Sequence, residues 1–336
     1  MLKNIFLGAG PMSFEIINSL DSFSKNYKKK IMLICSRNQI EAEELGGGYV
    51  NNFNTKTFSS FIQDKKNKNL ILSRDHSGPY KRDGIKKNFY KEIEDCKKSL
   101  KEDIKNNFKI LHIDTSMCGK KKYEVAEELI NFCNKYALHL KKKIFFEFGC
   151  EEHGVLTSLK KFKQDVKFIS KFKNKHFIVC QTGSLVKSIF QLGQFDIDNV
   201  IKMKKIADQN ELHLKEHNCD YLSNEQIKIR KKYGISAINV APELGFIQSN
   251  LFFYKSKEYN LNKKLNTFFS YVLKKNKWKK WIYKDENDVI KFLSSAHYFF
   301  TSDPYYDLKD TLSKYINIQK TLDKLIFQNV KRYYQN

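Results

Sequence analysis

Eight short segments, most of them mainly apolar, recur along the first 250 residues, and longer stretches with helical spacing separate them. Segments rich in Ile, Leu, Val and Phe are typical of parallel strands that are buried on both faces. Between them, residues such as Phe14, Ile17 and Leu20 repeat every three or four positions and predict amphipathic helices. The predicted strands cover residues 4–7, 31–35, 70–72, 109–113, 143–146, 176–180, 211–215 and 236–238.

The regular alternation of strand and helix predicts an α/β fold. Eight strand–helix units without an obvious sequence repeat favour a (β/α)8 TIM barrel over residues 1–250. Residues 251–336 contain helix-like stretches rich in aromatic side chains, and we expect them to form a C-terminal helical extension packed on the barrel.

An acid and a histidine stand side by side where the third predicted strand ends, in the stretch Arg74-Asp75-His76-Ser77-Gly78-Pro79. In a parallel barrel the carboxyl ends of the strands surround the active site. We therefore predict that His76 binds a divalent metal through a ring nitrogen. Asp75 is placed to move a proton to or from a substrate hydroxyl beside that metal.

Strands five and seven end in further candidate ligands, Glu147 and His217, which complete a His-His-carboxylate set with His76. Such a set suits zinc, manganese or iron, and we expect zinc. A metal held there would polarise a substrate carbonyl and stabilise an enediolate. Gln181, after strand six, offers a neutral oxygen to the metal or the substrate. His112 is expected to be a core histidine instead, because it lies inside an apolar strand.

A glycine pair after the first strand supports a different interpretation. Gly8-Ala9-Gly10 follows the strand as in a dinucleotide-binding turn, and Arg37 after the second strand could face a 2′-phosphate. Ser13 occupies the third glycine position of that motif, which weakens the match. An NADP-linked oxidoreductase is therefore an alternative, ranked last because eight strands fit a barrel better than an open sheet.

Charge and cysteine content restrict the function classes. The chain has 61 Lys and Arg against 37 Asp and Glu, a net charge of +24. The lysines are spread over nearly all predicted helices, so we expect a solvated basic surface and no nucleic-acid partner. Seven scattered cysteines without a Cys-x-x-Cys pair suit a reducing cytoplasm. We find no signal peptide and no apolar span long enough for a membrane.

Six strand-end motifs together resemble a known family. R-D-H-S-G-P, H-I-D-T-S-M, E-F-G-C-E-E-H-G, Q-T-G, K-E-H-N-C-D-Y and I-N-V-A-P-E-L, with S-R-N-Q and G-G-G-Y earlier, occur in one order across residues 5–250. This set resembles the tagatose-bisphosphate aldolase subunits of the GatZ/KbaZ type, which are relatives of the class II metal-dependent aldolases. The resemblance lies in the order and barrel placement of the motifs, since no single motif is specific.

The resemblance implies roles for individual residues. Asp75 matches the residue that exchanges a proton with the substrate C4 hydroxyl, and Glu152 resembles the acid on a mobile loop that protonates the enediolate. His76 and His217 match metal-binding histidines, and Glu147 matches a carboxylate at the metal site. Asn239 matches an asparagine near the substrate, and Gly183 resembles a glycine whose backbone meets a substrate phosphate. The full set of predicted substrate contacts is Ser36, Asn38, Asp114, Ser116, Gln181, Gly183 and Asn239.

Two departures from the family pattern leave alternatives open. Catalytic aldolases have His-Gly where this chain has Thr182-Gly183 after Gln181, a change shared with the GatZ type. The stretch that carries arginines in that type is 294–298 here and has none. We therefore predict a metal-dependent 4-epimerase or aldolase that acts on a ketose or ketose phosphate. The alternative is a non-catalytic stabilising subunit of a separate aldolase, and a homo-oligomer also fits.

Overall fold

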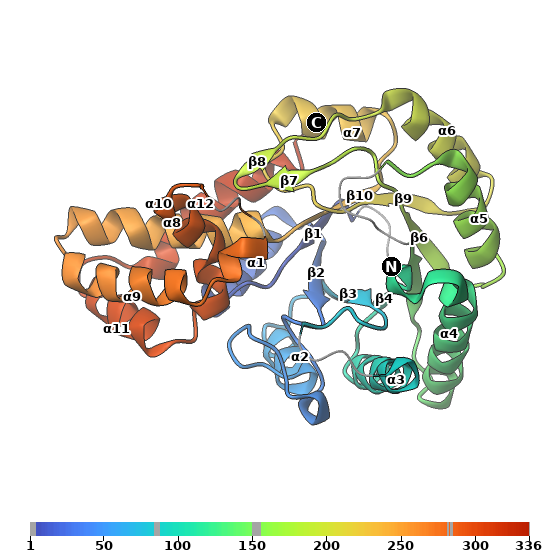
Figure 1. Cartoon of the computed structure of the whole chain (residues 1–336), viewed down its shortest axis with the longest axis horizontal. Coiled ribbons are helices and arrows are strands. Elements are labelled where there is room, and N and C mark those ends of the chain that lie inside the picture. The colour runs from blue at the N-terminus through green and yellow to red at the C-terminus, as the bar shows by residue number, and fades with distance from the viewer. Residues whose placement is uncertain (1–4, 84–87, 150–155, 281, 283–284, 336) are drawn as a thin grey trace.

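Eight parallel strands form a closed barrel, which confirms the predicted (β/α)8 fold (Figure 1). The computed structural model describes residues 5–83, 88–149, 156–280, 282 and 285–335. Around the barrel the hydrogen-bonded order is β1-β10-β9-β6-β5-β4-β3-β2. The barrel strands are β1 Leu7–Ala9, β2 Ile31–Ser36, β3 Leu70–Ser77, β4 Ile110–Ile113, β5 Phe145–Phe148, β6 Lys175–Val179, β9 His213–Glu216 and β10 Ala237–Val240.

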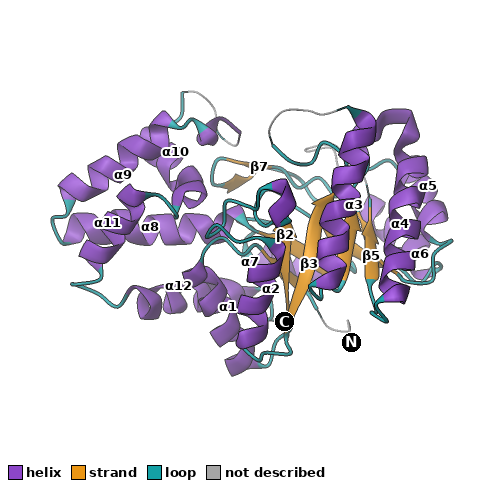
Figure 2. Cartoon of the chain, turned by 90° about the horizontal axis from the view of Figure 1, so that it is seen from below, coloured by secondary structure: helices purple, strands orange, loops and turns teal. Residues whose placement is uncertain are grey.

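Helices surround the strands, and the last helices form the predicted extension on one side of the barrel (Figures 1 and 2). Helix α8 runs through residue 250, where the sequence placed the boundary of the extension. The helices are α1 Phe14–Tyr27, α2 Thr55–Asp64, α3 Phe89–Lys105, α4 Lys122–His139, α5 Leu159–Ile169, α6 Ile197–Asp208, α7 Asn224–Lys232, α8 Pro242–Glu258, α9 Asn262–Lys274, α10 Asp288–Ser295, α11 Asp303–Leu312 and α12 Ile318–Arg332.

The third strand is longer than its apolar pattern predicted. It continues through the polar residues to Ser77 and pairs with β2 from Leu70 to Asp75. Arg74 in this segment is fully buried, and its guanidinium makes two contacts with the Asp103 carboxylate of α3, at 2.6 and 2.8 Å. A bidentate ion pair of this kind satisfies the guanidinium inside the protein. A short hairpin, β7 Val186–Lys187 and β8 Phe190–Gln191, was also not predicted.

Close strand packing explains the glycines that suggested nucleotide binding. A Cβ on Gly8 would lie 2.3 Å from Asn239 Oδ1 and 2.9 Å from Ile34 Cγ2. Arg37 is 1% exposed, and its Nε donates to Glu41 at 2.6 Å. The glycine therefore makes room inside the barrel, and Arg37 is engaged with a carboxylate. The closed barrel replaces the open sheet on which the NADP-linked alternative depended.

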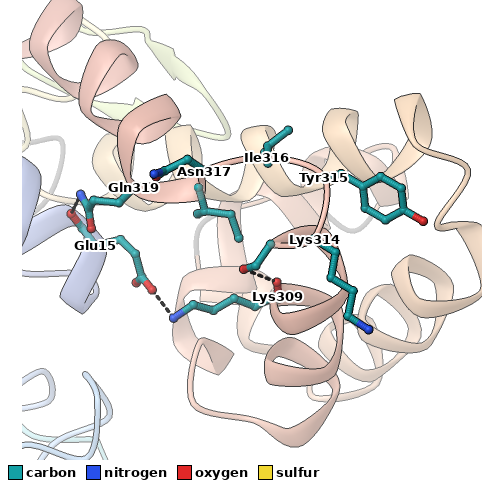
Figure 3. Close-up of a pocket in the computed structure, with 9 residues that line it drawn as sticks. Glu15, Lys309, Lys314, Tyr315, Ile316, Asn317 and Gln319 are labelled. Atoms are coloured by element: carbon teal, nitrogen blue, oxygen red, sulfur yellow. Dashed lines mark hydrogen bonds and ion pairs between the residues drawn. The ribbon is translucent and has the colours of Figure 1, made fainter.

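Polar contacts join the extension to the first barrel helix (Figure 3). Lys309 of α11 forms an ion pair with Glu15 of α1, and Gln319 of α12 donates to the Glu15 carbonyl oxygen at 3.1 Å. The loop between α11 and α12 borders a cavity of about 550 Å³ next to these contacts. Two helices distant in sequence from α1 are thus attached to it at the same residue.

The described cysteines, Cys35, Cys96, Cys118, Cys133, Cys180 and Cys219, are all buried thiols. Among the helices in the described residues, none combines the length and apolar character needed to cross a membrane.

Candidate metal centre and active-site cavity

A backbone irregularity turns both Asp75 and His76 toward the mouth of the barrel. Adjacent residues of a regular strand point to opposite faces. Here the pairing of β3 with β4 shifts register between Arg74 and Ser77, and His76 has a φ of +46°. A positive φ is unfavourable for a residue with a Cβ, and such strain is typical of functional sites. The shift re-aims one side chain and lets the neighbouring pair occupy one pocket.

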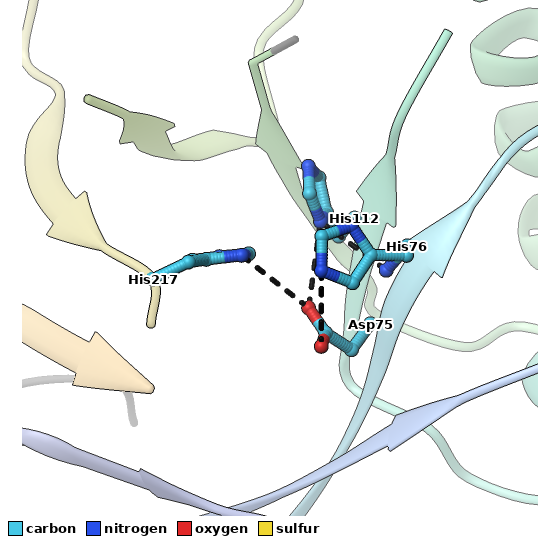
Figure 4. A group of neighbouring side chains, drawn as sticks. All are labelled: Asp75, His76, His112 and His217. Carbon is cyan, nitrogen blue, oxygen red and sulfur yellow. Dashed lines mark hydrogen bonds and ion pairs between the residues drawn. The ribbon is translucent and has the colours of Figure 1, made fainter. Parts of the chain in front are cut away.

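Three imidazoles converge on the Asp75 carboxylate (Figure 4). The third, His112 of β4, joins His76 and His217, and one ligand atom from each of the four residues lies within 4.8 Å of the others. His76 Nε2 is 3.6 Å from Asp75 Oδ2, while His112 Nδ1 and His217 Nδ1 are 3.5 and 3.8 Å from Oδ1. His112 Nδ1 also accepts a hydrogen bond from the His76 backbone N–H at 3.3 Å.

The other nitrogen of each ring is held by an oxygen on the far side of the cluster. Histidines that bind metals usually make such an outer contact, because it fixes the tautomer and the orientation of the ring. The remaining nitrogens are therefore directed inward together. The outer pairs are His76 Nδ1 with Asp114 Oδ2 at 2.8 Å, His112 Nε2 with the Gly149 carbonyl oxygen at 3.2 Å, and His217 Nε2 with Glu147 Oε1 at 2.6 Å.

Neighbouring cationic groups lower the pKa of Asp75 and of two buried acids next to the cluster, Glu147 and Asp114. Burial would raise the pKa of Asp75, but the three neighbouring imidazoles hold this pKa well below its usual range. Burial likewise opposes ionisation of Glu147, yet Lys215 and two of the histidines lower its pKa to about 2. For Asp114, the contacts with His76 and Lys81 outweigh burial, so its pKa is also lowered. The charged forms of these carboxylates are therefore stabilised beside the histidines.

The cluster lies at the side of a cavity of about 230 Å³ at the barrel mouth. Asp75, His76 and His217 line it together with residues from the C-terminal extension. These are His297 and Tyr298 of the short helix η4 Ala296–Phe299, and the Tyr298 ring centroid is 4.9 Å from that of Tyr49. The extension thus forms part of the cavity wall.

The predicted substrate contacts occupy different positions around this cavity. Ser36, Asn38 and Asn239 line it, and Asn239 Nδ2 donates to Asp75 Oδ1 at 3.4 Å. Asp114 lies behind His76, and Ser116 Oγ donates to it at 2.7 Å. The two remaining residues, Gln181 and Gly183, belong to the loop after β6 and are not among the residues that line the cavity.

Two findings refine the predicted centre, and one predicted residue is not among those described. Glu152 lies outside the described residues. Glu147 contacts Lys215 Nζ and His217 Nε2 with its two oxygens, and it is not part of the four-residue group. His112, expected to be a core histidine, belongs to that group. Its signal in the sequence was its place near the C-terminal end of a strand, two residues before Asp114, but an apolar strand around a histidine also fits simple core packing.

Asp220 provides a pH-dependent test of the cavity wall. Burial and the nearby Glu243 raise the pKa of Asp220 to about 7, although Oδ1 accepts N–H bonds from Ala241 and Glu243. A carboxyl group with a raised folded-state pKa costs stability as pH rises from its unfolded pKa to its folded pKa. Asp220→Asn keeps an acceptor oxygen and removes this cost. We expect the difference in free energy of unfolding between the variant and the parent to grow, in favour of the variant, by roughly 1–3 kcal/mol from about pH 5 to about pH 8. Urea denaturation at both pH values measures this, and a pH-independent difference would contradict it.

Comparisons with known proteins agree on the fold. No protein-family model and no curated protein sequence matches this chain. Among solved structures, a probable tagatose 6 phosphate kinase from Sinorhizobium meliloti 1021 has a TM-score of 0.77 and 15% identity, covering 97% of this chain and 92% of its own. The fructose-bisphosphate aldolase from Campylobacter jejuni has a TM-score of 0.59 and 12% identity, and the match covers 98% of this chain and 90% of the aldolase. The YdjI aldolase from Escherichia coli K12 has a TM-score of 0.57 and 13% identity, and the match covers 98% of this chain and 91% of YdjI. At these identities the similarity establishes that the chain shares the barrel fold of these proteins.

Proposed function

We propose that this protein is a metal-dependent enzyme of the class II aldolase type, which acts on a ketose or ketose phosphate as a 4-epimerase or an aldolase. The observation that carries the proposal is the arrangement of three imidazoles, each anchored on its outer nitrogen and directed inward beside Asp75. Two structural neighbours named as aldolases share the fold on which this arrangement is built.

The residues present fit a divalent metal. His76, His112 and His217 would hold it, because neutral imidazole nitrogens with a neighbouring carboxylate suit zinc, manganese or iron. A divalent ion held by these residues would supply Lewis-acid chemistry, the polarisation of a carbonyl and of a hydroxyl next to it. We assign Glu147 to the support of His217 rather than to the ion, since its oxygens contact Lys215 Nζ and His217 Nε2 and it is not part of the four-residue group.

Asp75 is the group that we assign to proton transfer. Its carboxylate lines the cavity beside His76 and His217, and Asn239 donates to one of its oxygens, so a substrate hydroxyl in the cavity would meet an acceptor oxygen there. Removal of that proton starts retro-aldol cleavage, and re-addition to the other face of the aldehyde would complete an epimerisation. Glu152 is proposed, from the family resemblance, to handle the second proton.

The substrate would lie between the histidines and the wall made by Tyr49 and the extension. The cavity of about 230 Å³ has the scale of a small sugar, and hydroxyl and amide groups of Ser36, Asn38 and Asn239 face it. Lys81, the lysine that lines this cavity in the described part of the chain, is paired with Asp114 at 2.7 Å. Hydrogen bonding to hydroxyl groups is therefore the main recognition that the described lining offers.

The test is to incubate the metal-loaded protein with a panel of free and phosphorylated ketoses and to follow the products by NMR. A 4-epimerase would form the C4 epimer, and an aldolase would form a triose or its phosphate with an aldehyde. We expect the protein to convert at least one ketose and to lose this activity when the metal is chelated. Failure on every ketose, with recovery only when a second aldolase chain is added, would favour the stabilising-subunit alternative instead.

A further inference from the structure

A lysine lies inside the barrel directly behind the histidine cluster. Lys215 of β9 is fully buried, and its Nζ is 2.5 Å from Glu147 Oε2. The aromatic ring of Phe177 lies 5.4 Å from the same Nζ and belongs to an apolar layer inside the barrel with Ile71 and Ile110. A buried ammonium group is costly unless it is paired, so the contact with Glu147 is what permits Lys215 in this position.

The two oxygens of Glu147 are divided between a cation and a ring. Oε2 contacts Lys215, whereas Oε1 accepts from His217 Nε2 at 2.6 Å and lies 3.8 Å from His112 Nδ1. The carboxylate is therefore close enough to the inward-facing nitrogens to enter the centre if it were released. Its position depends on Lys215, which supplies the compensating charge on the side away from the cluster.

We propose that Lys215 is a positioning residue of the metal centre: it neutralises Glu147 and holds its carboxylate behind His217, as an acceptor for the ring N–H, instead of leaving it to bind the ion. The inference rests on the metal site of the proposed function. It accounts for the buried ion pair of Lys215 and Glu147 next to the apolar layer that contains Phe177. A donor set with fewer carboxylates leaves more positive charge on the ion, which makes the ion a stronger Lewis acid.

Cobalt(II) is the probe for this inference, because its visible absorption bands weaken as its coordination number rises. The variants are Lys215→Met, which removes the charge and keeps the length of the side chain, and Lys215→Arg, which restores a cation. In Lys215→Met we expect weaker bands than in the parent, since the released Glu147 carboxylate joins the ion. Lys215→Arg should keep a parent-like spectrum, and the double variant Lys215→Met with Glu147→Gln should return to one.

The outcomes separate this inference from the proposed function. A parent that binds no cobalt overturns the metal site and the inference together. A parent that binds cobalt and shares its spectrum with Lys215→Met overturns only the role of Lys215, which would then be a packing residue. If Lys215→Met does not fold, Lys215→Gln retains a polar donor to Glu147 without the charge. The same loss of band intensity is expected there, and an unchanged spectrum would refute the proposal.

Discussion

Replacing Asp75 with asparagine is expected to reduce turnover of the ketose substrate by about 10²–10⁴-fold, the range for loss of a proton-transfer group. The side chain keeps its shape and its contact with Asn239, but the amide cannot accept the hydroxyl proton. Metal affinity should change far less than turnover, because three histidines remain to hold the ion. Steady-state kinetics and metal titration of the same preparation measure both effects.

Asp307→Asn is the matched control for this substitution. Asp307 is an exposed residue of α11 that pairs with Lys264, and the same chemical change there should leave turnover at the parent level. Equal turnover by Asp75→Asn and the parent would refute the assigned proton transfer. A loss of metal as large as the loss of turnover would instead make Asp75 a ligand.

Replacing His112 with alanine is expected to weaken zinc binding by at least about 100-fold, more than the loss usual for residues that only support a ligand. The substitution removes one of the three inward-facing nitrogens and leaves the contact between His217 and Glu147 in place. Competition with a chromogenic chelator measures the affinity. His213→Ala is the control, because His213 lies at the opposite end of β9 from the cluster, next to His176.

Unchanged zinc affinity in His112→Ala would return this residue to the role of a core histidine. Loss of zinc in both histidine variants would indicate general destabilisation rather than loss of a ligand. Thermal denaturation of each metal-free variant distinguishes these cases, because a ligand residue affects mainly the stabilisation gained on adding metal.

The barrel could be predicted from the sequence because buried parallel strands leave a strong apolar signal. The segment 31–35 is a continuous apolar run and became a strand, as did the segment 110–113, which is apolar apart from His112. The third strand was underestimated for a physical reason. Its polar half is stabilised by Arg74 and Asp103, which are distant in sequence, and an apolar pattern contains no information about such a pair.

The centre could be predicted only in part, for reasons of register and backbone shape. Sequence placed Asp75, His76 and His217 at strand ends, and the structure brings them together. The sequence could not show the register shift that turns Asp75 and His76 the same way. It also could not show that His112 is opposite Glu147 in the β4–β5 ladder. The partner of a buried lysine such as Lys215 is also invisible along the chain, because the contact joins strands far apart in sequence.

Metal content tests the central claim most directly. The purified protein should be analysed for zinc, manganese and iron beside the double variant His76→Ala with His217→Ala. The account predicts about one equivalent of a divalent ion per chain in the parent, bound as purified or after incubation with the ion, and its loss in the variant. A parent that takes up no divalent ion, or a variant that keeps the same amount, would contradict the metal centre proposed for this barrel.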